Sequence, residues 1–259
     1  LPYPKPLDSM MDSWTRHVID GQKPWQAVFI TAADLDRDGL QDIVTGGWWY
    51  KNPGSPSGAW TRNTIGTPLN NLAALYDFDG DGDLDVLGTQ GQGSAADARF
   101  VWAQNDGAGS FTIRTNISAG QGNFLQGVAV ARFTSGGPLE VALSWHVGGQ
   151  GVQMLAVPAD PVVSTWPWRV VSTLSQDEQL TAGDIDRDGD LDLLLGTQWL
   201  RKDAAAWSLQ TLNSSGGLPD RNRLVDINGD GRLDAVVGFE GVSTTAKLVW
   251  YEQPVSPTD

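Results

Sequence analysis

Four segments of this chain combine aspartates and a glycine at a spacing that could hold a metal ion. Each follows the pattern D-x-[DN]-x-D-G-x-x-D, and carboxylates at positions 1, 3 and 5 of such a tight loop can converge on one cation. The glycine at position 6 permits the sharp turn that directs the carbonyl of position 7 inward, and the aspartate at position 9 completes the ligand set. These four acidic loops are Asp34–Asp42, Asp77–Asp85, Asp184–Asp192 and Asp226–Asp234.

Oxygen ligands of this kind favour Ca²⁺ over Mg²⁺, because Mg²⁺ demands a tight octahedron and retains its waters. We therefore expect about four Ca²⁺ ions, one in each loop. The fourth loop has Asn228 in place of one carboxylate, so we expect it to bind most weakly. The predicted ligands are Asp34, Asp36, Asp38, Leu40 and Asp42; Asp77, Asp79, Asp81, Asp83 and Asp85; Asp184, Asp186, Asp188, Asp190 and Asp192; and Asp226, Asn228, Asp230, Arg232 and Asp234, with Leu40, Asp83, Asp190 and Arg232 contributing backbone carbonyls. Solvated Asp/Gly turns are the alternative, but four copies at identical spacing favour metal binding.

The composition is that of a globular protein with an acidic surface. The chain has 259 residues, of which 40% are hydrophobic and 19% are charged, and this suits a packed core. Its net charge of −14 would repel a phosphate backbone, and no basic stripe is present, so we expect no nucleic acid partner. The absence of cysteine excludes disulfides and thiolate metal sites. No apolar run reaches the roughly 18 residues of a membrane-spanning helix, so we expect no membrane insertion.

Short apolar strands surround each acidic loop in a recurring order. In the second repeat, one strand precedes the loop at residues 72–76, one follows it at residues 86–88, a third carries an aromatic residue at 101–105, and a fourth spans 111–117. Four short strands in each unit of about 40–55 residues are typical of a β-propeller blade. A degenerate copy at residues 128–143 keeps this spacing.

In that degenerate copy, Arg132, Thr134 and Gly136 stand at the positions of the metal-binding carboxylates, so we expect no ion there. With it, the repeats predict one all-β domain over residues 1–259, a five-bladed β-propeller of four-stranded antiparallel blades. The ends at residues 1–11 and 255–259 are short and proline-rich.

The last repeat stops after its third strand, and the N-terminus offers a fourth. Residues 14–19 match Trp60–Ile65 at four of six positions. We therefore expect residues 14–19 to complete the last blade and close the ring, which would remove open strand edges. The alternative is that the chain is a fragment of a larger ring.

The loop motif, with an apolar strand before it and a short aliphatic strand after it, resembles the FG-GAP/VCBS family of calcium-binding propeller repeats. The resemblance covers roughly residues 14–254. It implies a calcium-binding propeller but no single function, since similar propellers occur in integrin heads, fungal lectins and polysaccharide lyases. Weak calcium loops are usable where calcium is millimolar, so we expect an extracellular, secreted or periplasmic protein. The chain begins at Leu1 without an initiator methionine, which suggests a mature or excised domain.

In a propeller the acidic loops lie on one face, so the other connecting loops offer the opposite face for a ligand. The candidate ligand-binding residues there are Trp48, Gln90, Trp145, His146, Gln198, Arg223 and Glu240. Aromatic rings pack on the C–H faces of sugars and amides bond their hydroxyls, so this mixture suits carbohydrate. Among the 12 tryptophans, the candidates for exposure are Trp25, Trp48, Trp145, Trp166 and Trp199, whereas the repeated positions, Trp250 among them, should pack between blades.

Three functions are compatible with this sequence. The first is a secreted calcium-binding propeller whose partner is a glycan or another extracellular protein. The second is a carbohydrate-active enzyme, a polysaccharide lyase or glycosidase, with His146 as general base and Glu240 or Arg223 as its partner. The third is a structural or adhesion module of a larger protein. His146 and the long insertion at residues 146–166 belong to the repeat without a metal loop, which is where we expect the functional site.

Overall fold

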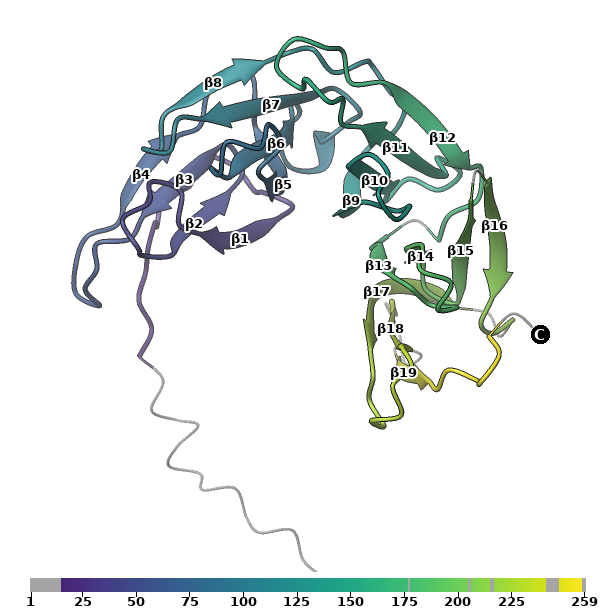
Figure 1. The fold of residues 1–259 in the computed structure, drawn as a ribbon. Helices are drawn as coiled ribbons and strands as arrows, with labels where there is room; N and C mark the ends of the chain where they lie inside the picture. Colours follow the sequence, from purple (N-terminus) through teal and green to yellow (C-terminus); the bar gives the residue numbers. More distant parts are fainter. Residues whose placement is uncertain (1–14, 177, 205, 215–216, 241–246, 258–259) are drawn as a thin grey trace, which may run out of the picture.

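The computed structural model describes residues 15–176, 178–204, 206–214, 217–240 and 247–257, and these form five antiparallel sheets. Each sheet is made of consecutive strands, so the chain completes one sheet before it begins the next (Figure 1). Within the described residues, no helix is long and apolar enough to cross a membrane. The structure therefore confirms an all-β chain built from a repeated unit.

The strands have the following bounds. The first sheet contains β1 (Ile30–Ala33), β2 (Asp42–Thr45), β3 (Trp48–Lys51) and β4 (Thr61–Thr64). The second contains β5 (Asn71–Tyr76), β6 (Asp85–Thr89), β7 (Phe100–Asn105) and β8 (Phe111–Arg114), with the short 3₁₀ helix η1 (Gly93–Ala95) before β7. The third contains β9 (Leu125–Ala131), β10 (Glu140–Trp145), β11 (Val152–Ala156) and β12 (Trp168–Ser172). The fourth contains β13 (Thr181–Gly183), β14 (Asp192–Leu194), β15 (Gln198–Asp203) and β16 (Ala206–Thr211), and the fifth contains β17 (Leu218–Val225), β18 (Asp234–Glu240) and β19 (Lys247–Tyr251).

The sequence repeat becomes a repeated strand register. In the first, second, fourth and fifth sheets, position 9 of the acidic loop begins the second strand and pairs with the last residue of the first strand, as Asp42 does with Ala33. Glu140 occupies the same place opposite Ala131 in the third sheet. The glycine at position 6 has a φ between 82° and 96° in all four acidic loops, a region that disfavours residues with a Cβ. The sharp turn that the motif predicts at position 6 is thus confirmed.

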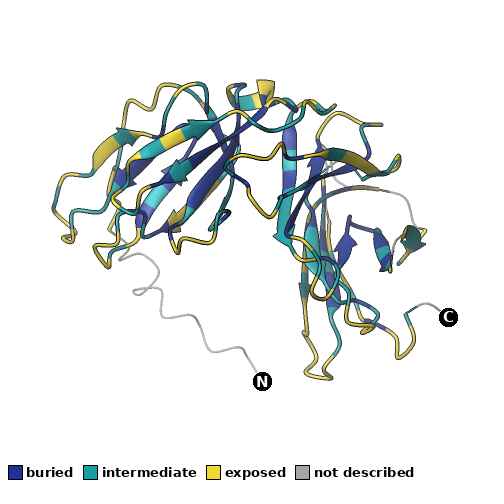
Figure 2. Ribbon diagram, turned by 45° about the horizontal axis from the view of Figure 1, so that its top comes forward, coloured by how far each residue is buried: buried dark blue, intermediate teal, exposed yellow. Residues whose placement is uncertain are grey.

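Buried apolar side chains gather between successive sheets. One cluster joins Trp49 of the first sheet to Val86 of the second, and the largest joins Trp102 of the second to Trp145 of the third. Two further clusters join the third sheet to the fourth and the fourth to the fifth. Figure 2 shows the buried residues concentrated on the strands and the exposed ones on the connecting loops. The sheets therefore stabilise one another in series.

The five sheets follow an arc, with β1, β5, β9, β13 and β17 on its inner side (Figure 1). The first and last sheets lie at the two ends of this arc, and the last has only three strands in the described residues. Residues 15–19 form no strand, so the prediction that residues 14–19 complete the last sheet is wrong for these five residues, and Trp14 lies outside the described part.

The contacts of Asp20 explain where this N-terminal segment lies. The Asp20 carboxylate accepts hydrogen bonds from the Tyr50 hydroxyl (2.9 Å) and from Arg62 Nη1 (2.7 Å). Both donors belong to the first sheet, so they hold the segment there. The match to Trp60–Ile65 indicated a strand-like composition, but it did not identify which edge the segment would approach.

Candidate metal centres and the opposite polar face

Three acidic loops gather carboxylates closely enough to hold a cation. One carboxylate oxygen from each of positions 1, 3 and 9 lies within 4.8 Å of the others. The three groups are Asp34, Asp36 and Asp42; Asp77, Asp79 and Asp85; and Asp184, Asp186 and Asp192. The fourth loop offers Asn228 at position 3, so it has one fewer carboxylate for such a group.

Unpaired buried oxygens indicate that these loops fit a metal ion. Asp36 Oδ1 and Asp184 Oδ1 are buried without a hydrogen-bond partner, and the Asp36 side chain is only 11% exposed. A buried carboxylate oxygen that has lost its water and gained no donor carries a free-energy cost. A hard cation bound among these oxygens would remove that cost and the repulsion between the carboxylates.

The aspartate at position 9 also has a structural role that sequence reasoning missed. Asp85 Oδ2 accepts the backbone N–H of Phe78 (3.0 Å), and Oδ1 accepts that of Asn105 on the third strand (2.9 Å). We call this pair of hydrogen bonds the backbone clamp. The same clamp is formed by Asp42 with Leu35 and Asn52, by Asp192 with Ile185 and Lys202, and by Asp234 with Ile227 and Gln253.

Burial raises the pKa of the clamp aspartate in the first three acidic loops. At Asp234 desolvation acts in the same direction, but the backbone hydrogen bonds from Gln253 and Ile227 help to bring the pKa below its usual value. Desolvation is the main cause that raises the pKa of Asp85 and of Asp192 to about 7. The clamp hydrogen bonds act to lower the pKa, and the neighbouring carboxylates act to raise it. Desolvation also raises the pKa of Asp42. A nearby cation would favour the ionised forms of these groups, so metal binding and ionisation support each other.

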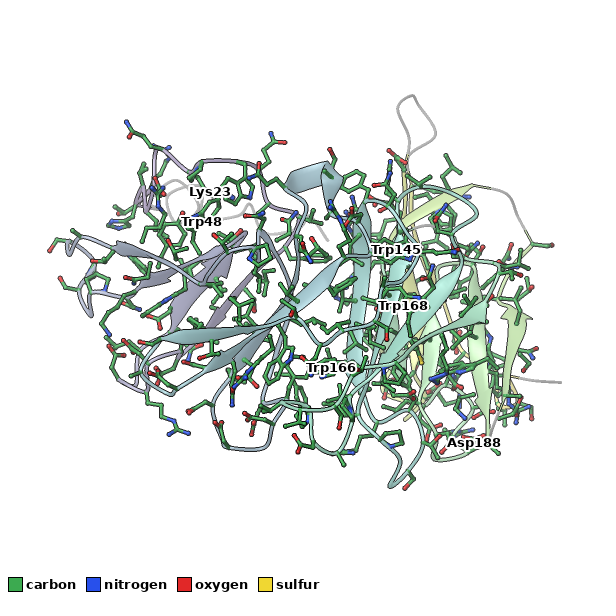
Figure 3. All side chains as sticks on the ribbon, turned by 90° about the horizontal axis from the view of Figure 1, so that it is seen from above. Lys23, Trp48, Trp145, Trp166, Trp168 and Asp188 are labelled. Carbon is green, nitrogen blue, oxygen red and sulfur yellow. The ribbon has the colours of Figure 1, made fainter. Side chains whose placement is uncertain are left out.

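A second polar cluster lies at the other ends of the strands. Gln126, His146, Glu178 and Arg221 form it, and we call it the His146 cluster. His146 Nδ1 lies 2.6 Å from Glu178 Oε1, and Arg221 Nη1 lies 3.0 Å from Glu178 Oε2. Arg221 Nη2 also donates to Gln126 Oε1 (3.2 Å). Figure 3 shows Asp188 of the third acidic loop near one edge of the molecule and Trp145, the neighbour of His146, well away from that edge.

The local backbone holds the cluster together. His146 follows the last residue of β10, and the Ser144 hydroxyl of that strand donates to the carbonyl of Glu178. The Phe124 ring lies 4.8 Å from the His146 ring, centroid to centroid. The Glu178 side chain is only 11% exposed, whereas those of His146 and Arg221 are 45% and 53% exposed. The cluster thus presents an imidazole and a guanidinium to solvent over a largely buried carboxylate.

The predicted partners of His146 are wrong, and nearby residues take their place. Its carboxylate partner is Glu178 and not Glu240, and Glu178 in turn pairs with Arg221 and not with Arg223. Arg221 precedes Arg223 by two residues on β17, so strand alternation could have identified it. Glu178 is in the loop before β13, two residues ahead of Leu180. No strand repeat marks this loop position.

Four tryptophans predicted to be exposed are buried. Trp48 is 5% exposed, and Trp145, Trp166 and Trp199 are at most 1% exposed. Trp145 and Trp166 belong to the cluster between the second and third sheets, and Trp199 belongs to the cluster between the fourth and fifth. The Trp145 ring lies 6.4 Å from Phe100, centroid to centroid. Trp25 is half-buried against Trp48. Trp250, predicted to be packed, is 45% exposed, because no described strand covers β19 on its outer side.

The remaining predicted ligand residues occupy separate places on the strands or next to them. Gln90 follows β6, and its carbonyl accepts Asn70 Nδ2 (2.7 Å). The backbone N–H of Gln198 donates to the Gln176 side chain (2.9 Å). Glu240 is exposed at the end of β18. Arg223 is exposed on β17 and lines a shallow pocket of about 330 Å³ together with Gln179, Arg221 and Leu248.

Comparisons with known proteins show similarity of fold. No known family and no curated protein sequence matches the chain. The Bacillus licheniformis rhamnogalacturonan lyase PL11 superimposes with a TM-score of 0.51 at 15% identity, over 85% of this chain and 48% of the lyase. The V. cholerae biofilm matrix protein Bap1 superimposes with a TM-score of 0.53 at 15% identity, over 92% of this chain and 39% of Bap1. The chain therefore spans less than half the length of either protein, and identities this low show the fold alone.

Proposed function

We propose that this chain is a calcium-binding β-propeller module of the FG-GAP/VCBS type that acts outside the cytosol and binds polysaccharide. In this proposal the five sheets are blades, and the acidic loops hold Ca²⁺ on one face. The polysaccharide binds the opposite face. The serial antiparallel sheets and the three aspartate groups support the architecture and the metal. When bound, Ca²⁺ would supply the positive charge that the grouped carboxylates need.

The observation that carries the binding proposal is the convergence of three sheets on the His146 cluster. Gln126 and His146 come from the third sheet region, Glu178 from the loop leading into the fourth, and Arg221 from the fifth. Sugar hydroxyls both donate and accept hydrogen bonds, and this cluster offers an exposed imidazole, an amide and a guanidinium. Arg221 also lines the neighbouring 330 Å³ pocket, which has room for part of a sugar chain.

The similar folds give independent support. One protein is named as a rhamnogalacturonan lyase and the other as a biofilm matrix protein. A polysaccharide and a biofilm matrix are the surroundings that these two names give, and they support a glycan partner and an extracellular location for this chain. The low identities mean that the site itself must be argued from this chain's own residues.

Arg221→Ala is expected to weaken glycan binding at least tenfold, because hydrogen bonds to charged groups contribute roughly 1.5–3 kcal/mol. A glycan array with the calcium-loaded protein would first identify a ligand, and titration of the variant would then measure the loss. Arg132→Ala is the matched control, since Arg132 is an exposed arginine of the degenerate loop at the other ends of the strands. Equal affinities of the two variants would contradict the assignment of the His146 cluster.

The distance of 2.6 Å between His146 Nδ1 and Glu178 Oε1 favours a second candidate function, a lyase acting on uronate-containing polysaccharide. With Nδ1 protonated toward Glu178, Nε2 is free to act as a base. It would take the proton on the carbon next to the uronate carboxylate. The electron pair forms a C=C bond, the glycosidic C–O bond breaks, and the leaving oxygen takes a proton from solvent.

Ultraviolet absorbance of unsaturated uronate that His146→Ala abolishes would establish this activity, whereas binding without turnover favours the first function. No response in either assay favours a structural or adhesion module.

Calcium is expected to raise the thermal midpoint of unfolding by about 5–10 °C, and EGTA is expected to reverse the rise. A ligand that binds only the folded state at 100 times its Kd stabilises that state by about 2.7 kcal/mol. The measurement is a thermal melt of the chelated protein, repeated after addition of Ca²⁺ and, separately, of Mg²⁺. A midpoint that does not move with Ca²⁺ would contradict the metal proposal.

A further inference from the structure

The strand register defines one equivalent position in each sheet, at the end of the third strand or directly after it. In the first sheet, Ile43 is the residue after position 9 of the loop, and it pairs with Tyr50 on the third strand. The position in question is the next residue along that strand, Lys51. The same register defines the position in the other sheets. We call it the facing position, and its residues are Lys51, Gln104, Ala156, Arg201 and Glu252.

In the four acidic loops, the facing residue contacts position 3 directly. Lys51 Nζ contacts Asp36 Oδ2, and it also lies 2.6 Å from Asp38 Oδ2. Gln104 Nε2 donates to Asp79 Oδ2 (2.6 Å) in the second loop. These contacts bring a cation to the predicted ligands of the first loop but only a neutral amide to those of the second.

The third and fourth loops repeat the contact with different chemistry. Arg201 Nε lies 2.5 Å from Asp186 Oδ2 in the third loop, so a second cation is held there. In the fourth loop the roles are exchanged, since Asn228 Nδ2 donates to Glu252 Oε1 (3.0 Å). In the degenerate repeat, Thr134 stands at position 3 and Ala156 at the facing position.

The five repeats thus vary in step at two positions. A loop with Asp at position 3 has a donor at the facing position, the loop with Asn has Glu, and the loop without metal carboxylates has Ala. In each acidic loop, therefore, one of the two positions carries a carboxylate. The loops differ in whether a cationic side chain contacts that carboxylate. In the fourth loop the guanidinium of Arg232 contacts Asp230. This loop therefore also has a cationic side chain, but at position 5 and not at position 3. In the second loop, Arg37 lies 2.5 Å from Asp83, whose predicted contribution is its backbone carbonyl.

Resting on the calcium sites proposed above, we propose that the facing residue sets the calcium affinity of each loop. The second loop binds Ca²⁺ most tightly, because Gln104 adds no competing charge. The first and third loops bind it more weakly, because Ca²⁺ must displace or tolerate the cation of Lys51 or Arg201 next to its own charge. Glu252 supplies the fourth loop with the carboxylate that Asn228 lacks, so it is a metal ligand that the motif did not reveal.

A reciprocal exchange on the full chain tests this proposal. Lys51→Gln gives the first loop the arrangement of the second, and it should tighten one class of calcium site by about tenfold. Gln104→Lys does the reverse, and it should weaken the tightest site by about tenfold. Calcium is first removed from each protein with a chelator. Isothermal titration with CaCl₂ then measures the calcium dissociation constants of the two variants and of the wild type. Lys23→Gln is the charge-matched control, because Lys23 is exposed in the segment before β1, and it should leave all the constants unchanged.

The fourth loop has its own test. Glu252→Gln should remove or greatly weaken one calcium equivalent. The double variant Asn228→Asp with Glu252→Gln reproduces the pair Asp79 and Gln104 and should restore it. Rescue by the exchange separates a ligand role from a folding defect, and circular dichroism without calcium checks the fold of each variant.

The outcomes distinguish the two levels of the proposal. A wild-type chain that binds no Ca²⁺ would overturn the calcium sites and this inference with them. A wild-type chain that binds Ca²⁺ with constants that neither Lys51→Gln nor Gln104→Lys changes would overturn only the role of the facing residue.

Discussion

Asp85→Ala is expected to lower the free energy of unfolding of the calcium-free protein by about 2–4 kcal/mol. The substitution leaves the backbone N–H groups of Phe78 and Asn105 without their acceptor, and Asp85 itself is fully buried. Each buried donor that loses its partner costs about 1–3 kcal/mol, and removal of the buried carboxyl, whose pKa is raised to about 7, offsets part of the total. Chemical denaturation in EGTA at neutral pH measures this effect.

Asp81→Ala in the same loop is the control for that measurement. Asp81 is exposed at position 5, so its loss should cost little in EGTA and should act mainly by reducing the stabilisation that calcium adds. If Asp85→Ala were as stable as the wild type in EGTA and differed only with calcium, the backbone clamp would contribute nothing. Position 9 would then be a metal ligand alone.

Trp145→Ala is expected to cost about 3–5 kcal/mol of stability, the range for removing a large aromatic side chain from a packed core. The Trp145 ring is fully buried between the second and third sheets, against Phe100 and Trp168. The cavity left by the substitution would weaken the largest of the four clusters between sheets. The free energy of unfolding in denaturant, with calcium present, measures the loss.

Trp250→Ala is the matched comparison, because Trp250 is 45% exposed on β19 and its removal should cost far less. A Trp145→Ala variant that kept its stability but lost glycan binding would contradict the packing role. It would support the ligand-binding role that the sequence had suggested for this residue.

Features that repeat along the chain could be predicted from the sequence. The strands around each acidic loop and the turn at Gly39, Gly82, Gly189 and Gly231 follow from local patterns that occur several times. The grouping of carboxylates follows from the same spacing. The degenerate repeat keeps an acid, Glu140, at position 9, and the structure places it at the start of β10, in register with the others.

Features that depend on contacts between repeats could not be predicted in the same way. Trp145 and Trp250 both lie close to the end of a strand in the sequence. Whether each ring is buried depends on whether a neighbouring sheet covers it, and the sequence of the strand itself does not show this. The pairing of His146 with Glu178 joins two sheets through a loop that no motif marks. The position of residues 15–19 depends on Tyr50 and Arg62, which hold Asp20 by side-chain hydrogen bonds.

The serial arrangement of the sheets has a consequence for how the molecule opens. The main contacts join β2 to β5, β5 to β9, β9 to β13, and β13 to β17, so the fold behaves as a linear array of coupled units. The fifth sheet is coupled through the smallest cluster and should detach before the centre unfolds. Because Arg221 belongs to that sheet, the first partial opening would dismantle the His146 cluster. An ion in the fourth acidic loop would stabilise the sheet that carries Arg221, so its binding would also support the cluster on the opposite face.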